Sequence, residues 1–486
     1  MSKVYFVGID SLPMWVVEEL KKSNVIGFSK FVEEGKIVES ESVIPPVTGI
    51  AWPSIYTGLP PGRHGAKNFF VLRENYALDI TFYDPERAKP FWDALAEKGY
   101  KSLIIAPPAV VKPSKNANVH MITGFPLPPK ANSKELELMM KKYGYKGESI
   151  ERGVEGGKFS IEKAAKIMLD SVKAKIGISR EMLARQNYDF FHVCFTEFDA
   201  LGHYTMGLTN WKDYMLPLYK EVGSFLDFLM RKAKEEGSLV TIASDHGMQR
   251  IYKKFLINSW LVKKNYALIK ANIATNKAGS QRAGGEKLYV FRDLILTTKL
   301  RHIYKALPLH IRSFLMRLVE VLLVDRRAGE YVKIYTSDFD MKHTKVFAFM
   351  AVDPVCGLFI NDKRFVSGCV GEKEKEALKV KLMRDLANAR DERGKIFAHI
   401  WDAEKYYGKG FYSGPITPDI FVGARDGLTI DPLHYSKEKL FMEPDAARKA
   451  DHMLYGVFGF YPKISLHLNR NFKITHIAPL ILSLYK

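Results

Sequence analysis

The sequence predicts an α/β protein, in which a mostly parallel sheet carries helices on both faces. Short apolar segments rich in β-branched and aromatic residues alternate with segments whose apolar residues recur at helical spacing. Alternation of this kind is typical of a parallel sheet whose strands are connected by helices. Several of the apolar segments also end directly in aspartate or histidine, and ligands of such sheets bind at the carboxyl ends of the strands.

The elements of this core are assigned in chain order. Residues 4–9 are a short apolar segment that ends at Asp10, which is the pattern of a buried strand, and a helix is expected to follow at 14–22. The same alternation then repeats along the chain. Further helices are expected at residues 91–99, 161–186 and 214–236, and further strands at residues 102–106, 189–195 and 239–243.

The pattern changes after about residue 265. Residues 299–324 are apolar with interleaved basic side chains, and Pro308 is expected to divide them into two helices. We predict that residues 265–419 form an inserted α+β cap that determines substrate specificity, while residues 1–264 and 420–486 form the core. Within the cap, strands are expected at 346–349 and 357–360, and a charged helix at 372–391.

Charge narrows the class of partner. The chain has 73 Lys and Arg against 54 Asp and Glu, and the resulting net charge of +19 favours anionic partners. Because the basic residues are spread along the chain and form no compact patch in the sequence, a nucleic acid is not the expected partner. A small anionic molecule is expected instead. Peripheral contact of the basic segment 299–324 with a membrane is an alternative, although a helix pair packed on the core is the simpler interpretation.

The cysteines and the apolar segments bear on location. Three cysteines without a CxxC pair argue against a disulfide framework and against a cysteine zinc site, and they predict a cytoplasmic protein. The N-terminal residues lack the apolar segment of a signal peptide. No segment reaches the roughly 20 apolar residues that a membrane-spanning helix requires. The oligomeric state cannot be inferred from these features.

Three of the predicted strand ends carry acidic or histidine side chains. Asp10 follows the first strand, Asp199 and His203 follow the strand at 189–195, and Asp245 and His246 follow the strand at 239–243. Carboxylate and imidazole groups suit zinc or manganese, and two such cations about 4 Å apart can stabilise phosphoryl transfer. Each residue alone is ordinarily a helix cap or a satisfied polar group, but their coincidence predicts a metal site.

A fourth feature is the turn around Thr48. A Thr–Gly pair that follows two prolines fits a tight turn opening a helix, which would expose the hydroxyl and direct backbone N–H groups toward an anion. A metal bound to that hydroxyl would activate it as a nucleophile. From spacing alone, Thr48 is better interpreted as the N-cap of the following helix.

Longer motifs resemble a known family. The segment PPVTGIAWPSIYTGLPPGRHG resembles the nucleophile segment of the type I phosphodiesterase/nucleotide pyrophosphatase family, in the alkaline phosphatase superfamily. The motifs VGIDS, FDALGH, SDHGM and HTKVFAF occur in the family's order, and the branch of phosphohydrolases and phosphomutases is the most similar. The resemblance implies an alkaline phosphatase-like core, two divalent cations and Thr48 as the nucleophile. The implied ligands are Asp10, Thr48, Asp245 and His246 at one site and Asp199, His203 and His452 at the other.

Some positions depart from the family pattern. His452 is preferred as the seventh ligand because HMLYGVFGFY resembles the family's late histidine segment, and His434 is the alternative. Nucleotide pyrophosphatases usually have Asn three residues after the nucleophile, where this chain has Ala51. We expect the backbone N–H of Gly49, and the side chain of Asn68, to contact the substrate instead.

Three functions are compatible with these residues. The leading hypothesis is a two-metal phosphoesterase that hydrolyses a phosphodiester or phosphomonoester through a phospho-threonine intermediate, with zinc as the expected metal and manganese as the alternative. A phosphomutase would use the same ligands and return the phosphoryl group to its substrate. A binding protein for membranes or nucleic acids would instead rely on the basic side chains Arg301, Lys305, Arg312, Arg317, Arg326 and Arg327.

Overall fold

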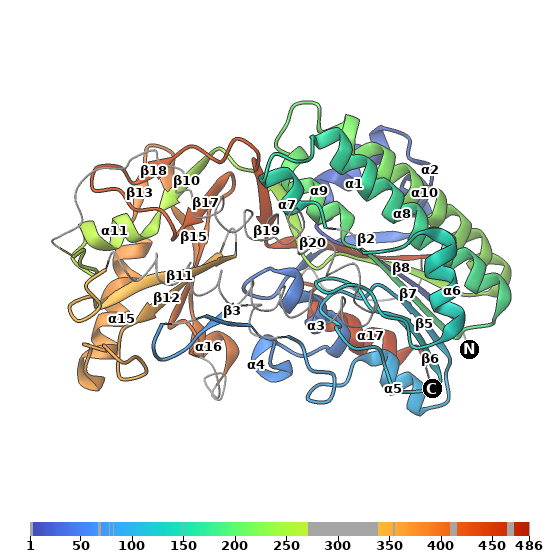
Figure 1. Cartoon of the computed structure of the whole chain (residues 1–486), viewed down its shortest axis with the longest axis horizontal. Coiled ribbons are helices and arrows are strands. Elements are labelled where there is room, and N and C mark those ends of the chain that lie inside the picture. The colour runs from blue at the N-terminus through green and yellow to red at the C-terminus, as the bar shows by residue number, and fades with distance from the viewer. Residues whose placement is uncertain are drawn as a thin grey trace, which may run out of the picture.

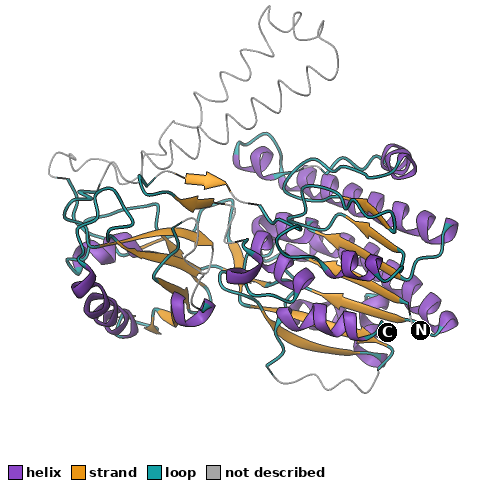
Figure 2. Cartoon of the chain, turned by 90° about the horizontal axis from the view of Figure 1, so that it is seen from below, coloured by secondary structure: helices purple, strands orange, loops and turns teal. Residues whose placement is uncertain are grey.

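The computed structural model describes residues 3–66, 70–76, 78–80, 82–147, 149–270, 339–352, 355–408, 416–463 and 471–485. These residues form two lobes that lie side by side (Figure 1). The larger lobe contains both ends of the chain and a sheet covered by helices on two faces (Figure 2). The smaller lobe is built around two further sheets.

A seven-stranded sheet forms the centre of the larger lobe, in the order β2-β20-β8-β1-β7-β5-β6. The strands are β1 (Val4–Ile9), β2 (Lys36–Glu41), β5 (Ser102–Ile105), β6 (Val119–Ile122), β7 (Phe190–Phe195), β8 (Leu239–Ala243) and β20 (Tyr455–Tyr461). The five strands from β8 to β6 are parallel, whereas β20 is antiparallel to both of its neighbours. The predicted α/β class with a mostly parallel sheet is confirmed.

Two helical layers bury the two faces of this sheet. One layer contains α1 (Met14–Lys22), α2 (Ile26–Glu34), α8 (Ile161–Arg185) and α10 (Trp211–Glu236), and the other contains α3 (Thr48–Thr57), α5 (Phe91–Glu97) and α17 (Ile477–Ser483). Within β1, Val7 and Ile9 pack against the first layer, whereas Val4 and Phe6 pack against the second. Burial on both faces explains why β1 is apolar at every position instead of at every second one.

The smaller lobe contains a four-stranded sheet, β11-β12-β16-β15, and a three-stranded sheet, β17-β10-β18. Its elements are β10 (Lys253–Leu256), α11 (Ile257–Lys263), β11 (Val346–Val352), β12 (Val355–Ile360), α15 (Glu372–Ala387), β15 (Phe397–Asp402), α16 (Ala403–Tyr407), β16 (Ile420–Ala424), β17 (Leu428–Asp431) and β18 (Phe441–Met442). The predicted strands at 346–349 and 357–360 lie within β11 and β12, and the predicted charged helix is α15. The division of the chain at residues 265 and 419 stays a prediction. Strand β10 precedes residue 265 and strand β16 follows residue 419, yet both belong to the sheets of the smaller lobe.

A two-stranded ladder connects the lobes. Strand β9 (Gly247–Arg250) pairs antiparallel with β19 (Ala450–Met453), and Arg250 lies opposite Ala450. The longest excursion of the chain into the smaller lobe therefore begins and ends next to the end of β8. An earlier segment also reaches the smaller lobe, because Leu72 and Tyr76 belong to its core cluster and Tyr76 bonds Asn361.

Three predictions concern residues outside the described part of the chain. These are the two basic helices at 299–324, the arginines that follow them, and the substrate contact of Asn68. Among the helices that the structure does describe, none combines the length and the apolar character needed to cross a membrane.

Candidate metal centre

Three neighbouring strands deliver the predicted ligands to one edge of the central sheet. Asp10 follows β1, Asp245 and His246 follow β8, and α9 (Glu197–Thr205) follows β7 and carries Asp199 and His203. Strand β1 lies between β8 and β7 and is parallel to both. Because parallel strands end at the same edge, residues separated by up to 236 positions in sequence become neighbours.

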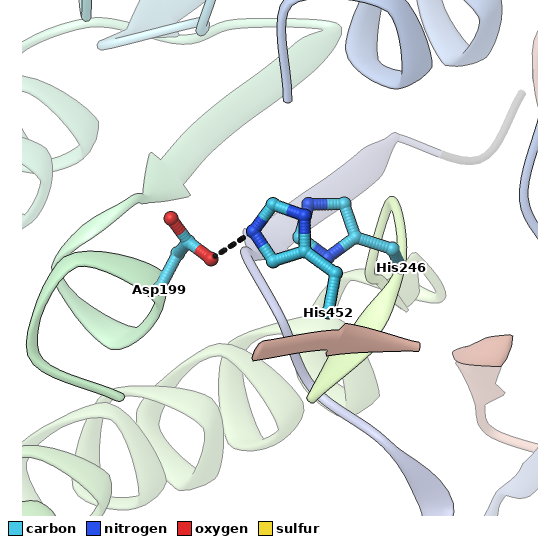
Figure 3. A group of neighbouring side chains, drawn as sticks. All are labelled: Asp199, His246 and His452. Carbon is cyan, nitrogen blue, oxygen red and sulfur yellow. Dashed lines mark hydrogen bonds and ion pairs between the residues drawn. The ribbon is translucent and has the colours of Figure 1, made fainter. Parts of the chain in front are cut away.

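The ladder between β9 and β19 brings the seventh predicted ligand to the same place. His452 lies opposite Met248, two residues beyond His246. The ring of His452 lies with its centroid 4.0 Å from that of His246 and 4.9 Å from that of His203. Figure 3 shows the His452 ring directed toward Asp199 and lying against His246. The alternative ligand, His434, bonds Asp431 at 2.8 Å and has a side chain that is 57% exposed.

Asp10, Asp245 and His246 form the first group. All three residues are fully buried, and their candidate ligand atoms lie within 4.8 Å of one another. Asp10 Oδ1, both carboxylate oxygens of Asp245 and His246 Nε2 make no hydrogen bond of acceptable geometry, although His246 Nε2 lies 3.2 Å from Asp245 Oδ2 and 3.6 Å from Asp10 Oδ1. Buried polar atoms normally have partners, because losing water without replacement costs about 1–3 kcal/mol for each group. Four such atoms around one point fit a bound cation.

The ionisation of the first group supports the same interpretation. Burial, together with Asp245 and Asp199, raises the pKa of Asp10 well above its ordinary value. Burial and Asp199 raise the pKa of Asp245 to about 7. Burial and His452 lower the pKa of His246 well below its ordinary value, so its imidazole is neutral and can be a ligand. A divalent cation would offset the repulsion between the two carboxylates.

Asp199, His203 and His452 form the second group. His452 Nε2 lies 3.1 Å from Asp199 Oδ1 and 3.2 Å from His203 Nε2, and His203 Nε2 lies 3.4 Å from Asp199 Oδ1. The other nitrogen of each ring faces a backbone carbonyl: His203 Nδ1 faces Ala450 O at 3.1 Å, and His452 Nδ1 faces Pro46 O at 3.0 Å. Such carbonyls orient metal-binding imidazoles, because they fix the proton on the nitrogen that faces the carbonyl and leave the other nitrogen free to bind a metal. Burial opposes ionisation of Asp199, yet His203 and His452 hold its pKa well below its ordinary range.

The start of α3 is tied to both groups. Pro46, two residues before Thr48, accepts the contact from His452, and Trp52 Nε1 donates to Asp10 Oδ2 at 3.0 Å one turn after Thr48. Thr48 is the first residue of the helix and is buried; the N-cap position belongs to Val47. Gly8 makes the approach of Trp52 possible, since a Cβ at this position would lie 2.6 Å from the indole. Gly49, the second residue of the helix, is also buried.

Three residues at this centre were not predicted from the sequence: Ser11, Asp451 and Arg448. Ser11 lies between the two groups: its hydroxyl donates to Asp199 Oδ1 at 2.6 Å and lies 3.2 Å from His246 Nδ1. Ser11 has a φ of 60°, a left-handed conformation that is uncommon for serine. Asp451 lies 3.6 Å from His203 Nδ1 and bonds Arg448. The position of Asp451 beside His452 and that of Ser11 beside Asp10 are the only signals that the sequence offered.

The donor set fits borderline divalent cations. Each group combines imidazole nitrogen with carboxylate oxygen, which suits zinc or manganese better than magnesium or calcium. All three cysteines are free thiols and none belongs to either group. The residues present therefore fit two divalent cations.

Comparisons with known proteins identify the family and the fold of the chain. The family model for type I phosphodiesterase/nucleotide pyrophosphatase matches residues 4–431, a span that contains every predicted ligand except His452. No curated protein sequence matches the chain. Phosphonoacetate hydrolase from Sinorhizobium meliloti 1021 with phosphonoformate is similar in fold, with a TM-score of 0.55 and 12% identity over 99% of this chain and 95% of that one. The complex of the same hydrolase with phosphonoacetate has a TM-score of 0.55 and 11% identity over 99% of this chain and 96% of that one.

A murine ectonucleotide pyrophosphatase/phosphodiesterase 5 structure is also similar, with 14% identity over 99% of this chain and 94% of that chain and a TM-score of 0.46. The fold is supported by the hydrolase structures, and the family by the span of the sequence match. The chain belongs to the type I phosphodiesterase/nucleotide pyrophosphatase family.

Proposed function

We propose that this member of a phosphoester-hydrolase family is a two-metal phosphoesterase that works through a phospho-threonine intermediate at Thr48. Its substrate is a small phosphodiester or phosphomonoester. The observation that supports this most is the group of four buried atoms without hydrogen bonds, from Asp10, Asp245 and His246, beside the start of α3. We also propose a cytoplasmic location, on the basis of the sparse, unpaired cysteines.

The ligands divide between two sites. We propose that Asp10, Thr48, Asp245 and His246 hold one cation, and that Asp199, His203 and His452 hold the other. Zinc is the expected metal and manganese the alternative, because both accept this mixture of imidazole and carboxylate. When bound, the two cations would supply positive charge for the entering and leaving oxygens.

The chain's own residues would position the reaction. Thr48 Oγ1 loses its proton to solvent and forms the new bond to phosphorus, while the leaving oxygen departs and takes up a proton. Water then attacks the phosphorus of the phospho-threonine, which releases the phosphoryl group and restores the Thr48 hydroxyl. Trp52 holds Asp10 while the backbone N–H groups at the start of α3, including that of Gly49, face the phosphoryl oxygens. We also propose, from the sequence, that the side chain of Asn68 contacts the substrate.

Replacement of Thr48 tests this proposal. With p-nitrophenyl phosphate and bis-p-nitrophenyl phosphate as substrates and zinc or manganese present, we expect Thr48→Ala to lower turnover by about three orders of magnitude, since the nucleophile is removed. Thr48→Ser keeps a hydroxyl and should retain part of the activity. Thr57→Ala, at the other end of the same helix, is the matched control and should retain turnover near the wild-type value. Wild-type turnover in Thr48→Ala would contradict the proposal.

A phosphomutase with the same ligands is the second candidate, and product analysis separates it from a hydrolase. In ¹⁸O-labelled water a hydrolase releases labelled free phosphate, whereas a mutase returns an unlabelled phosphoryl group to its substrate.

A further inference from the structure

A cationic side chain lies at the edge of the second ligand group. Arg448 is in the segment that leads from β18 in the smaller lobe to β19, three residues before Asp451. Its side chain is 37% exposed, so the guanidinium lies between the buried ligands and solvent. Arg448 Nη2 lies 3.4 Å from His203 Nε2 and donates to Asp451 Oδ1 at 3.3 Å.

The contact with His203 is unusual for a metal-binding imidazole. His203 Nε2 is the atom that converges with His452 and Asp199, and it therefore faces the proposed cation. A guanidinium carries only donors and is always charged. A dication on the other side of this nitrogen and a guanidinium beside it would repel each other strongly at such distances. The arrangement is favourable only if a negative charge lies near both of them.

The protein supplies only part of that negative charge. The first group has two carboxylates, Asp10 and Asp245, which together balance one dication. The second group has one carboxylate, Asp199, beside two imidazoles. A second acid, Asp451, lies close to both imidazoles and 3.6 Å from His203 Nδ1. The side chain of Asp451 is 6% exposed and lies 3.3 Å from Arg448 Nη2, so its single charge balances that of the guanidinium. It approaches His203 at Nδ1, whereas the proposed cation faces Nε2. This side of the centre keeps an excess of positive charge until an anion binds.

We propose that Arg448 binds a second negative charge of the substrate, beyond the single charge that every phosphodiester carries. This inference rests on the proposed function and specifies its substrate class. The second charge has two possible sources, which are the third oxygen of a phosphomonoester and a phosphate on the leaving group. Arginine suits either one, because its planar fork can donate two parallel hydrogen bonds to a phosphate.

Three substrates separate these sources. Bis-p-nitrophenyl phosphate has one negative charge, p-nitrophenyl phosphate has two on the transferred group, and ATP has further charges on its leaving group. We expect Arg448→Gln to lower kcat/KM about ten- to hundredfold for p-nitrophenyl phosphate, for ATP or for both, and less than threefold for bis-p-nitrophenyl phosphate. Arg448→Lys keeps the charge without the fork and should be intermediate. Lys449→Gln removes one positive charge from the exposed neighbouring residue, and it should change every value less than threefold.

Binding of inorganic phosphate gives a measurement that does not depend on turnover. Titration calorimetry of the zinc-loaded protein should show a Kd for phosphate about tenfold or more higher in Arg448→Gln and unchanged in Lys449→Gln. Zinc content is measured in parallel. If Arg448→Gln loses zinc, or lowers kcat/KM equally for all three substrates, Arg448 acts through His203 and the proposal is wrong. Unchanged kcat/KM and unchanged phosphate affinity would also overturn it.

The two proposals can fail separately. If the wild type hydrolyses none of the three substrates while Arg448→Gln still weakens phosphate binding, the anion site stands and the hydrolase proposal fails. If Thr48→Ala abolishes turnover while Arg448→Gln has no selective effect, the hydrolase stands and the role of Arg448 is rejected.

Discussion

At the scale of single residues, Trp52 connects the proposed nucleophile to the first ligand group. Its indole donates to Asp10 Oδ2, which leaves Asp10 Oδ1 as the oxygen without a hydrogen bond. Because Trp52 lies one turn after Thr48, the same bond orients the helix that carries the hydroxyl. A side chain that fixes a ligand in this way ordinarily affects metal affinity about 10- to 100-fold.

Replacement of Trp52 therefore has a measurable expected result. We expect Trp52→Phe to weaken zinc binding about 10- to 100-fold, as measured by competition with a chromophoric chelator. Trp92→Phe is the matched control, because Trp92 is equally buried in the same core cluster and lies on α5 away from the ligands. Equal zinc affinities in the two variants would show that Trp52 only fills space.

The proposed ligands could be named from the sequence, whereas the residues around them could not. Asp10 and Asp245 could be predicted because each lies just after an apolar strand, and Asp199 because it lies in the first turn of the helix that follows one. Parallel strands end at the same edge of the sheet, so these three residues must lie close together. Ser11 could not be predicted, since its role depends on a left-handed backbone that places one hydroxyl between two ligands. The contact of Arg448 with His203 depends on how the chain returns from the smaller lobe, for which the sequence has no periodic signal.

At the scale of elements, α9 is held in place by a buried ion pair. Lys175 on α8 donates to Glu197 at 2.9 Å and to the carbonyl of Cys194 at 2.8 Å, and Ser171 donates to the same carboxylate. The side chains of Lys175 and Glu197 are 2% and 4% exposed. Glu197 is the first residue of α9, so this pair fixes the start of the helix that carries Asp199 and His203.

Breaking this pair should be costly. We expect Lys175→Met to destabilise the protein by about 3–5 kcal/mol in urea unfolding, because Glu197 would remain buried without its counter-charge. The double variant Lys175→Met with Glu197→Leu removes both charges and should recover much of the loss. A single variant as stable as the wild type would mean that Glu197 becomes protonated or reaches water.

Elements were predictable where burial made their pattern simple. Strands β1, β7 and β8 are buried on both faces and are therefore almost entirely apolar, with His192 in β7 and Thr241 in β8 as the polar residues. Strand β2 lies at the edge of the sheet, and its charged sequence KIVESE follows from that position; it was not predicted. The ladder between β9 and β19 joins residues about 200 positions apart in four-residue strands, which are too short for a periodic signal.

At the scale of the whole molecule, the order of the chain explains why the centre lies where the lobes meet. All seven predicted ligands come from the larger lobe or from β19. The chain enters the smaller lobe after β9 and returns from it into β19. The segment just before β19 therefore brings Arg448 to the proposed ligands. We therefore propose that an insertion at this point can change substrate preference without moving the strands that position the proposed ligands.

Two buried histidines that lie outside the candidate metal centre, His64 and His192, should make the stability of the fold depend on pH. His192 lies in β7 among aromatic rings, where Nδ1 bonds Phe6 O and Nε2 has no partner. His64 accepts from Ala66 N and bonds Ser54. Burial lowers the pKa of each to about 3, with a further contribution from Arg87 at His64. Both imidazoles are therefore neutral in the folded protein at pH 5, whereas an unfolded histidine with a pKa of about 6.5 is charged there.

The sign of the effect follows from proton binding. Between pH 6.5 and 3 the unfolded chain binds the proton and the folded chain does not, so stability falls as the pH falls. From pH 7.5 to pH 5 each histidine should cost about 2 kcal/mol of unfolding free energy. We expect His192→Phe, which keeps an aromatic ring, to lose about 2 kcal/mol less than the wild type over this range in urea unfolding. His434→Phe is the contrast, because Asp431 raises the pKa of His434 and the pair stabilises the fold more at low pH. Identical pH profiles for the wild type and His192→Phe would show that His192 is charged or solvated in the folded protein.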